Sequence, residues 1–303
     1  MSILLTGGTG FVGKVLLQKY NIKKQVVREG RKHHYSSVYK IKTLNAETNW
    51  QGAFSDIDSI IHLAGLAHSN SFSEQDYQSV NVEGTLHFAN EAAKAGVKRF
   101  VFVSSIGVNG TSTYRTPFSV ESSPQPHNAY AQSKYDAELG LKHIANETGL
   151  EVVIVRPTLV YGPNAPGNFG VLSRLVNNFP LLPFGLTDNR RDFIAVQNLA
   201  DLLVTCAKHQ SAVGKTFLAS DGKTVSIKEF TNAIAEGLGK TTMQFPIPTN
   251  MIRFAACLLN KKLMVEQLVG NLQVDSSNTK KILGWSPPYT MKQAMTSLSE
   301  NNK

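Results

Sequence analysis

A glycine-rich turn close to the first residue constrains the fold of this chain more than any other feature. The apolar run Ile3–Thr6 is typical of a short strand, and before a helical pattern begins it is followed by Gly7, Gly8, Gly10 and Gly13. The first two glycines permit a tight turn, the third lets a pyrophosphate approach the backbone, and the fourth lets the helix pack closely on the sheet. Because the first N–H groups of a helix bind phosphate, the turn predicts a dinucleotide-binding site.

Short apolar strands alternate with helical patterns through the first half of the chain. Strands apolar on both faces that alternate with helices indicate a parallel sheet covered on both sides. We therefore expect an α/β fold with a doubly wound parallel sheet over residues 1–160. The remaining residues, 161–303, are richer in proline and predict a smaller C-terminal substrate lobe, from which a segment such as Lys215–Ala219 returns to the main sheet. The further strands expected in the first half are Gln25–Arg28, Ser59–Leu63, Arg99–Ser104 and Glu151–Arg156. The helices expected there are Phe11–Tyr20, Asp76–Ala95 and Ala129–Glu147.

Composition narrows the classes of partner. Apolar residues make up 42% of the 303 residues and charged residues 17%, which suits a large core. No run reaches the roughly 18–20 apolar residues of a membrane helix, and we see no secretory pattern, so we expect a cytoplasmic protein without a membrane partner. The net charge of +9 comes from scattered cations, which favours an anionic cofactor and substrate over nucleic acid.

Cysteine and histidine spacing predicts no metal site. Cys206 and Cys257 are expected to be buried, reduced thiols. The histidines lack a ligand-like spacing as well. His68 follows a strand and could reach a substrate, although an ordinary surface or core role is the simpler interpretation.

The end of the second strand bears on the choice between NAD and NADP. Arg28 is expected as the first residue beyond the strand, with Arg31 close enough to help. A guanidinium matches the 2′-phosphate of NADP, whereas Glu29 would hold the ribose hydroxyl of NAD if the strand ended one residue later. The pattern favours NADP and leaves NAD open.

Three side chains suggest hydride-transfer chemistry. Tyr130 and Lys134 are four residues apart at the start of an expected helix and so share one face. A nearby ammonium, with an oxidised nicotinamide, favours the phenolate and lowers the phenol pKa. Ser104 and Ser105 end the preceding strand, at the edge where ligands bind open α/β sheets. Either hydroxyl could bind the reacting oxygen, or could only cap the strand.

These residues occur together with further motifs in an order that resembles the extended short-chain dehydrogenases/reductases, the NAD-dependent epimerase/dehydratase family. The sequence is similar to UDP-sugar 4-epimerases and 4-ketoreductases of that family. The resemblance implies a Rossmann cofactor domain and a homodimer formed through the helices Asp76–Ala95 and Ala129–Glu147. The motifs that carry it are the glycine turn, Ile61–Gly65, Asn81–Thr85, Ser105–Gly110, Tyr130 with Lys134, and Arg156–Pro163.

The same resemblance implies residue roles. Tyr130 would be the acid/base, Ser105 the assisting hydroxyl that also contacts substrate, and Lys134 the cofactor clamp, with Asn81 bracing the site through backbone or water contacts. Asn168 and Arg191 match motifs that bind the diphosphate of a nucleotide sugar. The other expected cofactor contacts are Gly7, Gly10, Phe11, Val12, Gly13, Arg28, Leu63, Ala64, Gly65 and Pro157.

The main expectation for function is a 4-ketoreductase that transfers hydride from NADPH to C4 of a UDP-hexose or UDP-N-acetylhexosamine, because a consumed cofactor suits a one-way reduction. One alternative is a UDP-glucose/UDP-N-acetylglucosamine 4-epimerase that holds NAD tightly. Two others are a reductase of non-sugar ketones, which would not need Arg191, and a non-catalytic NADP-binding module.

Overall fold

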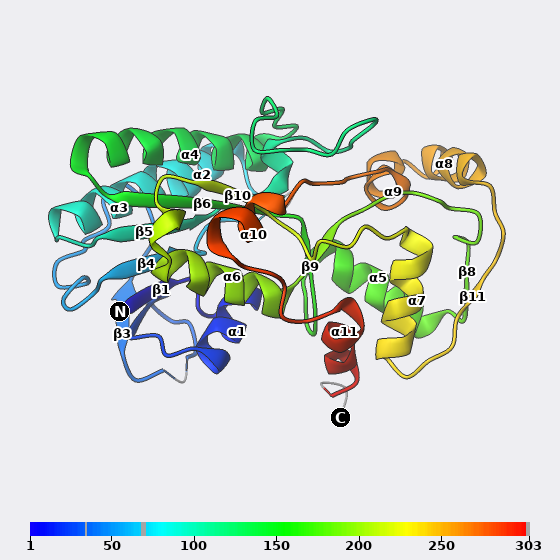
Figure 1. Cartoon of the computed structure of the whole chain (residues 1–303), viewed down its shortest axis with the longest axis horizontal. Coiled ribbons are helices and arrows are strands. Elements are labelled where there is room, and N and C mark those ends of the chain that lie inside the picture. The colour runs from blue at the N-terminus through cyan, green and yellow to red at the C-terminus, as the bar shows by residue number, and fades with distance from the viewer. Residues whose placement is uncertain (34, 68–70, 301–303) are drawn as a thin grey trace.

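The computed structural model describes residues 1–33, 35–67 and 71–300. Figure 1 shows a sheet with helices on both faces and, beside it, a smaller lobe built mainly from the second half of the chain. The expected doubly wound α/β fold is confirmed: seven parallel strands lie in the order β10-β6-β5-β4-β1-β2-β3. These strands are β1 (Ile3–Thr6), β2 (Lys24–Arg28), β3 (Val38–Ile41), β4 (Ser59–His62), β5 (Arg99–Val103), β6 (Glu151–Pro157) and β10 (Thr216–Ala219).

Successive residues of each strand pack on opposite faces of the sheet, as the two-residue repeat requires. Leu5 and Ile61 join one core with α1 (Phe11–Lys19) and α6 (Val196–Lys208). Their neighbours Leu4 and Ile60 join a second core with α3 (Gly84–Lys94) and α4 (Ala129–Thr148). Both faces are therefore buried, and only the carboxyl ends of the strands remain to form a site.

The helix expected at Asp76–Ala95 is divided into three parts. It comprises α2 (Glu74–Tyr77), the π-helical turn η1 (Gln78–Glu83) and α3. Gly96 follows at a φ of +81°, in the left-handed conformation that commonly ends a helix. The wider π turn carries Asn81, and such turns are frequent at functional sites.

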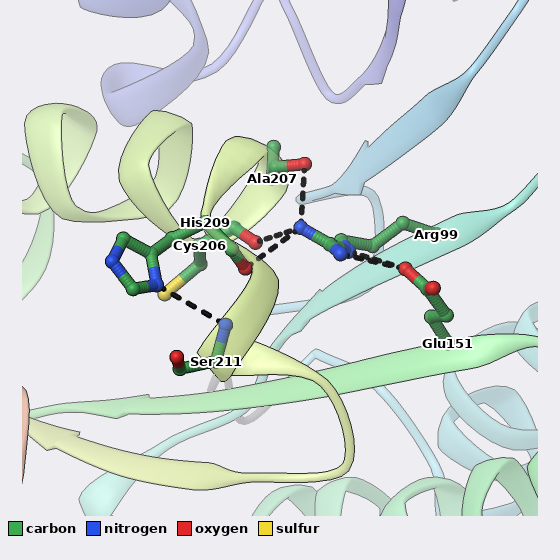
Figure 2. A network of polar contacts seen from close by, with 6 residues as sticks. All are labelled: Arg99, Glu151, Cys206, Ala207, His209 and Ser211. Atoms are coloured by element: carbon green, nitrogen blue, oxygen red, sulfur yellow. Dashed lines mark hydrogen bonds and ion pairs between the residues drawn. The ribbon is translucent and has the colours of Figure 1, made fainter. Parts of the chain in front are cut away.

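A buried arginine joins two strands to the end of a helix (Figure 2). Arg99 on β5 donates from Nε and Nη2 to Glu151 Oε2 on β6, at 2.9 and 2.6 Å. Its Nη1 donates to the carbonyl oxygens of Cys206, Ala207 and His209, at 3.4, 3.1 and 2.9 Å. The guanidinium therefore satisfies acceptors that the end of α6 leaves without helical partners.

The lobe has its own core, in which Phe193 stacks on Phe230 with ring centroids 3.8 Å apart. The expected return to the main sheet occurs at β10, and Trp285 also packs on the core of the sheet domain.

Within the described residues, no helix combines the length and the apolar character that crossing a membrane requires. The remaining elements are η2 (Ile106–Val108), β7 (Leu159–Tyr161), α5 (Gly167–Asn178), β8 (Leu181–Leu182), β9 (Phe193–Ala195), η3 (Gln210–Ala212), α7 (Ile227–Gly237), β11 (Met243–Gln244), α8 (Thr249–Leu258), α9 (Lys262–Val269), α10 (Ser277–Leu283) and α11 (Met291–Glu300).

The two cysteines differ in burial. Cys206 is buried in the core of the sheet domain, and burial raises the pKa of its thiol to about 12. Cys257 is exposed, which corrects the expectation of two buried thiols. It lies on α8, a helix of the lobe that packs little of its surface against the rest of the chain.

Candidate active site

The turn between β1 and α1 has the close backbone packing that its glycines predict. Gly7 adopts a φ of +71°, and its carbonyl oxygen accepts from the Gly10 N–H at 2.9 Å. A Cβ at Gly13 would lie 2.3 Å from the Gly7 oxygen and 2.6 Å from Gly8 Cα, so no side chain fits there. The turn keeps a backbone surface open at the start of α1, which fits the pyrophosphate of a dinucleotide.

The next strand end is tied to this turn. The N–H groups of Leu63 and Ala64 donate to Thr6 Oγ1, at 3.2 and 3.0 Å. His62 lies between Thr6 and Thr85, 2.9 and 3.0 Å from their hydroxyls, and burial lowers its pKa to about 3. The imidazole is therefore neutral and holds the sheet edge in place.

The other cofactor positions expected from the sequence lie around the same edge. Phe11 packs against the lobe core and Val12 against the sheet core, so α1 begins where the two parts meet. Gly65 faces Asn81 and Lys134: a Cβ there would lie 2.8 Å from Asn81 Oδ1. Pro157 is the buried last residue of β6, paired with Ala219 of β10.

The structure distinguishes the two serines after β5. Ser104 is buried and donates to Glu138 Oε1 at 2.5 Å, while Arg156 donates to both oxygens of the same carboxylate, at 2.9 and 2.5 Å. Ser105 caps η2, with its Oγ accepting from the Gly107 N–H at 3.0 Å, and it also hydrogen-bonds the Tyr130 phenol. Sequence reasoning missed the Glu138–Arg156 pair; its one signal was a glutamate four residues beyond Lys134 on the same helix face.

Tyr130 and Lys134 lie on the first turns of α4, which Asn128 caps by accepting from the Ala131 N–H at 2.8 Å. Lys134 Nζ donates to the Val103 carbonyl oxygen at 3.0 Å and lies 4.8 Å from the centroid of the Phe102 ring. Burial lowers the pKa of Lys134 to about 8, opposed by Glu138. The ammonium is therefore held at the carboxyl end of β5, beside the Ser105–Tyr130 pair.

Burial dominates the pKa of the Tyr130 phenol among the protein's own groups. Burial raises the pKa of the Tyr130 phenol to about 12, the Ser105 hydrogen bond opposes that rise, and Tyr77 adds to it. The protein's own groups thus favour the neutral phenol, and the lowering expected from the lysine together with an oxidised nicotinamide stays a prediction.

Asn81 supports the backbone of the tyrosine. Its Nδ2 donates to Ser133 Oγ at 3.0 Å, and that hydroxyl donates to the Tyr130 carbonyl oxygen at 2.8 Å. Its amide also pairs with the backbone of Leu66, accepting at 2.7 Å and donating at 3.1 Å. The contacts of Asn81 therefore run through the backbone of Leu66 and through the side chain of Ser133. Backbone contacts were expected from the sequence, whereas the contact with Ser133 was not.

A basic cavity of about 770 Å³ adjoins the glycine turn. Arg28 is the last residue of β2 rather than the first beyond it, and it does not line this cavity. Glu29 therefore takes the first position beyond the strand, which is the position expected to hold the ribose hydroxyl of NAD. Arg31 does line the cavity, together with residues that the sequence did not single out. The basic side chains that line it are those of Lys14, Arg31, Lys32 and His33.

The two expected substrate residues lie in the lobe, near the end of α9. Asn168 is exposed at the start of α5, and its Nδ2 donates to Gln267 Oε1 at 2.9 Å. Arg191 is buried and donates from Nη1 to the Gly270 carbonyl oxygen at 2.9 Å; burial lowers its pKa to about 10, which leaves it charged at neutral pH. His68 lies outside the described residues. No group of three or more potential metal ligands comes together among the residues that the structure places.

Comparison with known proteins agrees with this architecture. The model of the NAD dependent epimerase/dehydratase family matches residues 3–219. The UDP-glucose 4-epimerase of Vibrio cholerae is 39% identical, over 100% of this chain and 97% of that protein. The N-acetyl-alpha-D-glucosaminyl-diphospho-ditrans,octacis-undecaprenol 4-epimerase of Escherichia coli O157:H7 is 25% identical, over 97% and 93%. The crystal structure of a Thermotoga maritima UDP-glucose 4-epimerase with UDP-glucose has a TM-score of 0.76 at 22% identity, with both chains fully covered, which shows the shared fold.

Proposed function

The chain belongs to the NAD dependent epimerase/dehydratase family, and from that premise we propose that this enzyme is a UDP-sugar 4-epimerase acting on UDP-glucose or UDP-N-acetylglucosamine. The observation that carries the proposal is the Ser105–Tyr130 hydrogen bond beside Lys134, at the carboxyl end of β5. The full-length similarity to a 4-epimerase favours epimerisation over the one-way reduction expected from the sequence.

The chain's own residues would hold and move a proton at the C4 oxygen. A bound nicotinamide supplies the acceptor and donor of hydride. Tyr130 takes the hydroxyl proton during oxidation and returns it during reduction, while Ser105 hydrogen-bonds the same oxygen. Tyr130 must be the phenolate to take that proton, and burial alone favours the neutral phenol. The positive charges of Lys134 and of an oxidised nicotinamide would oppose that effect and favour the phenolate.

Arg191 and Asn168 are the proposed contacts of the sugar diphosphate. Their side chains both reach the segment 267–270, so one end of a substrate could be held between α5 and α9. A charged guanidinium that is already desolvated by burial binds an anion strongly. A neutral ketone would not use this arginine, which disfavours a reductase of non-sugar ketones.

One observation favours a second candidate, the NADPH-dependent 4-ketoreductase. Lys14, Arg31 and Lys32 line the cavity beside the glycine turn, where a 2′-phosphate on the adenosine ribose would find cations. We therefore propose that the enzyme accepts NADP as well as NAD. The homodimer through α3 and α4 stays a prediction that light scattering would test.

The deciding experiment offers the purified enzyme UDP-glucose or UDP-N-acetylglucosamine with NAD or NADP, and the 4-keto-6-deoxy derivative of the latter with NADH or NADPH. Exchange between C4 isomers without net change in nicotinamide absorbance supports the epimerase. Loss of that absorbance with the keto sugar alone supports the ketoreductase. Binding of cofactor with no turnover of any substrate, and no effect of Tyr130→Phe, would leave the non-catalytic module and refute both.

A further inference from the structure

The helix α8 exposes an apolar surface that neither the proposed site nor the lobe core uses. Met251, Phe254 and Leu258 are spaced three and four residues apart and therefore form one stripe along the helix. With Leu259 they make up what we term the α8 face. Their side chains are 61%, 67%, 70% and 71% exposed in chain order.

The opposite side of α8 already packs against the lobe. Ala256 is buried, Ile252 packs against the lobe core, and Arg253 forms an ion pair with Glu266 of α9, with Nε 2.8 Å from Oε1. The helix is thus apolar nearly all round yet buried on one side only. A helix with this composition is normally covered, and contiguous exposed apolar surface usually marks an interaction site.

The charge around the α8 face indicates what covers it. Residues 249–266 contain three cations, Arg253, Lys261 and Lys262, and one acid, Glu266, which pairs with Arg253, so the segment carries a net positive charge. A second copy of the chain would bring the same positive segment against itself in a two-fold interface, which is unfavourable. A nucleic acid would match the charge but not the exposed leucines and phenylalanine.

We propose that the α8 face docks on the surface of an anionic lipid bilayer. Apolar side chains on one helix face with lysines beside them are the pattern of a helix that lies in the membrane interface. Phe254 and Leu258 enter the boundary of the acyl chains, and Lys261 approaches the headgroups. This role lies beyond the proposed reaction and departs from the expectation, drawn from the sequence, that the chain has no membrane partner.

Sedimentation with vesicles tests the proposal. The full chain is mixed with vesicles of phosphatidylglycerol and phosphatidylethanolamine, or of phosphatidylcholine alone, at low and high salt. We expect binding to the anionic vesicles that weakens as salt rises. Each large apolar side chain contributes roughly tenfold or more to the affinity of the chain for the vesicles. The double variant Phe254→Ser with Leu258→Ser should therefore lower that affinity by about a hundredfold. Lys261→Gln should lower it by about fivefold.

Leu186→Ser is the matched control, because Leu186 is an exposed leucine of the lobe that lies outside α8 and outside the helices of the expected homodimer. It should bind vesicles as the unaltered chain does. Turnover of UDP-sugars should be the same in all variants, which keeps this test independent of the proposed reaction. The proposal is overturned if the unaltered chain ignores anionic vesicles, if the double variant binds them equally, or if the double variant instead changes the oligomeric mass of a chain that binds no lipid.

Discussion

The buried pair of Glu138 and Arg156 allows a quantitative prediction about how the site is supported. Both side chains are almost fully buried, and Arg156 places Nε and Nη2 on the two carboxylate oxygens at 2.9 and 2.5 Å. Its Nη1 donates to Asn109 Oδ1 at 3.0 Å, and Ser104 donates to the carboxylate. Removing Arg156 would leave a buried carboxylate with one neutral hydroxyl donor.

The expected cost follows from that geometry. Breaking a buried pair by removing one partner destabilises by roughly 3–5 kcal/mol, because the remaining charge stays desolvated. At about 2–4 °C per kcal/mol for large domains, Arg156→Met should lower the thermal midpoint by roughly 6–20 °C. The double variant Glu138→Met with Arg156→Met removes both charges and should recover much of that loss, since an apolar pair of similar volume often replaces a buried ion pair at little cost.

Urea unfolding and thermal scans of the two single variants and the double variant complete the cycle. Our interpretation requires the double variant to be more stable than Arg156→Met. If each single change costs under about 1 kcal/mol, or if the double variant loses the sum of the two, the pair is not the coupled, desolvated unit that we describe.

Three further changes test the site residues. Gly13→Ala places a methyl against the Gly7 oxygen and should weaken dinucleotide binding roughly tenfold or more in a fluorescence titration. The control is Gly149→Ala, because Gly149 lies in open space at a φ of +75°. That change should cost about 1 kcal/mol of stability and leave dinucleotide binding intact. Burial lowers the pKa of Lys134 from 10.5 to about 8, so its ammonium opposes folding below pH 8 and this cost disappears as the pH rises towards 10.5. Lys134→Met should therefore abolish turnover yet raise the unfolding free energy at pH 7 by on the order of 1 kcal/mol. This gain in stability should vanish by pH 10.5. If the variant is no more stable at pH 7, the burial argument is contradicted. The folded pKa of His62 is lowered from 6.5 to about 3, so stability is lost as the pH falls between those values, at a slope of about 1.4 kcal/mol per pH unit. His62→Gln should flatten that part of the urea-measured pH profile, and an unchanged slope would mean that the imidazole is not neutral in the fold.

The features that the sequence predicted well are those encoded locally. The strand at Ile3–Thr6 and the glycines after it fix the first turn by steric rules alone. The spacing of Tyr130 and Lys134 fixes one helix face in the same way. The division into a sheet domain and a proline-rich lobe, drawn from composition, stays a prediction.

The features that it could not predict depend on contacts between distant segments. Only the pairing of Glu138 with Arg156 shows that Ser104 is a structural residue and leaves Ser105 for the tyrosine. The π turn at Asn81 adds a residue to a helix without any composition signal. The edge strand β3 was missed because Val38–Ile41 mixes exposed and buried positions.

The central claim, hydride transfer at C4 with Tyr130 as the acid/base, is tested most directly by isotope retention. UDP-glucose or UDP-N-acetylglucosamine deuterated at C4 is incubated with the enzyme and its dinucleotide, and the C4 isomer is examined by mass spectrometry. We predict that the product keeps the deuterium, and that Tyr130→Phe slows its formation by roughly 10²–10⁴-fold. A product that has lost the label to water, or a Tyr130→Phe variant as fast as the unaltered enzyme, would contradict the account.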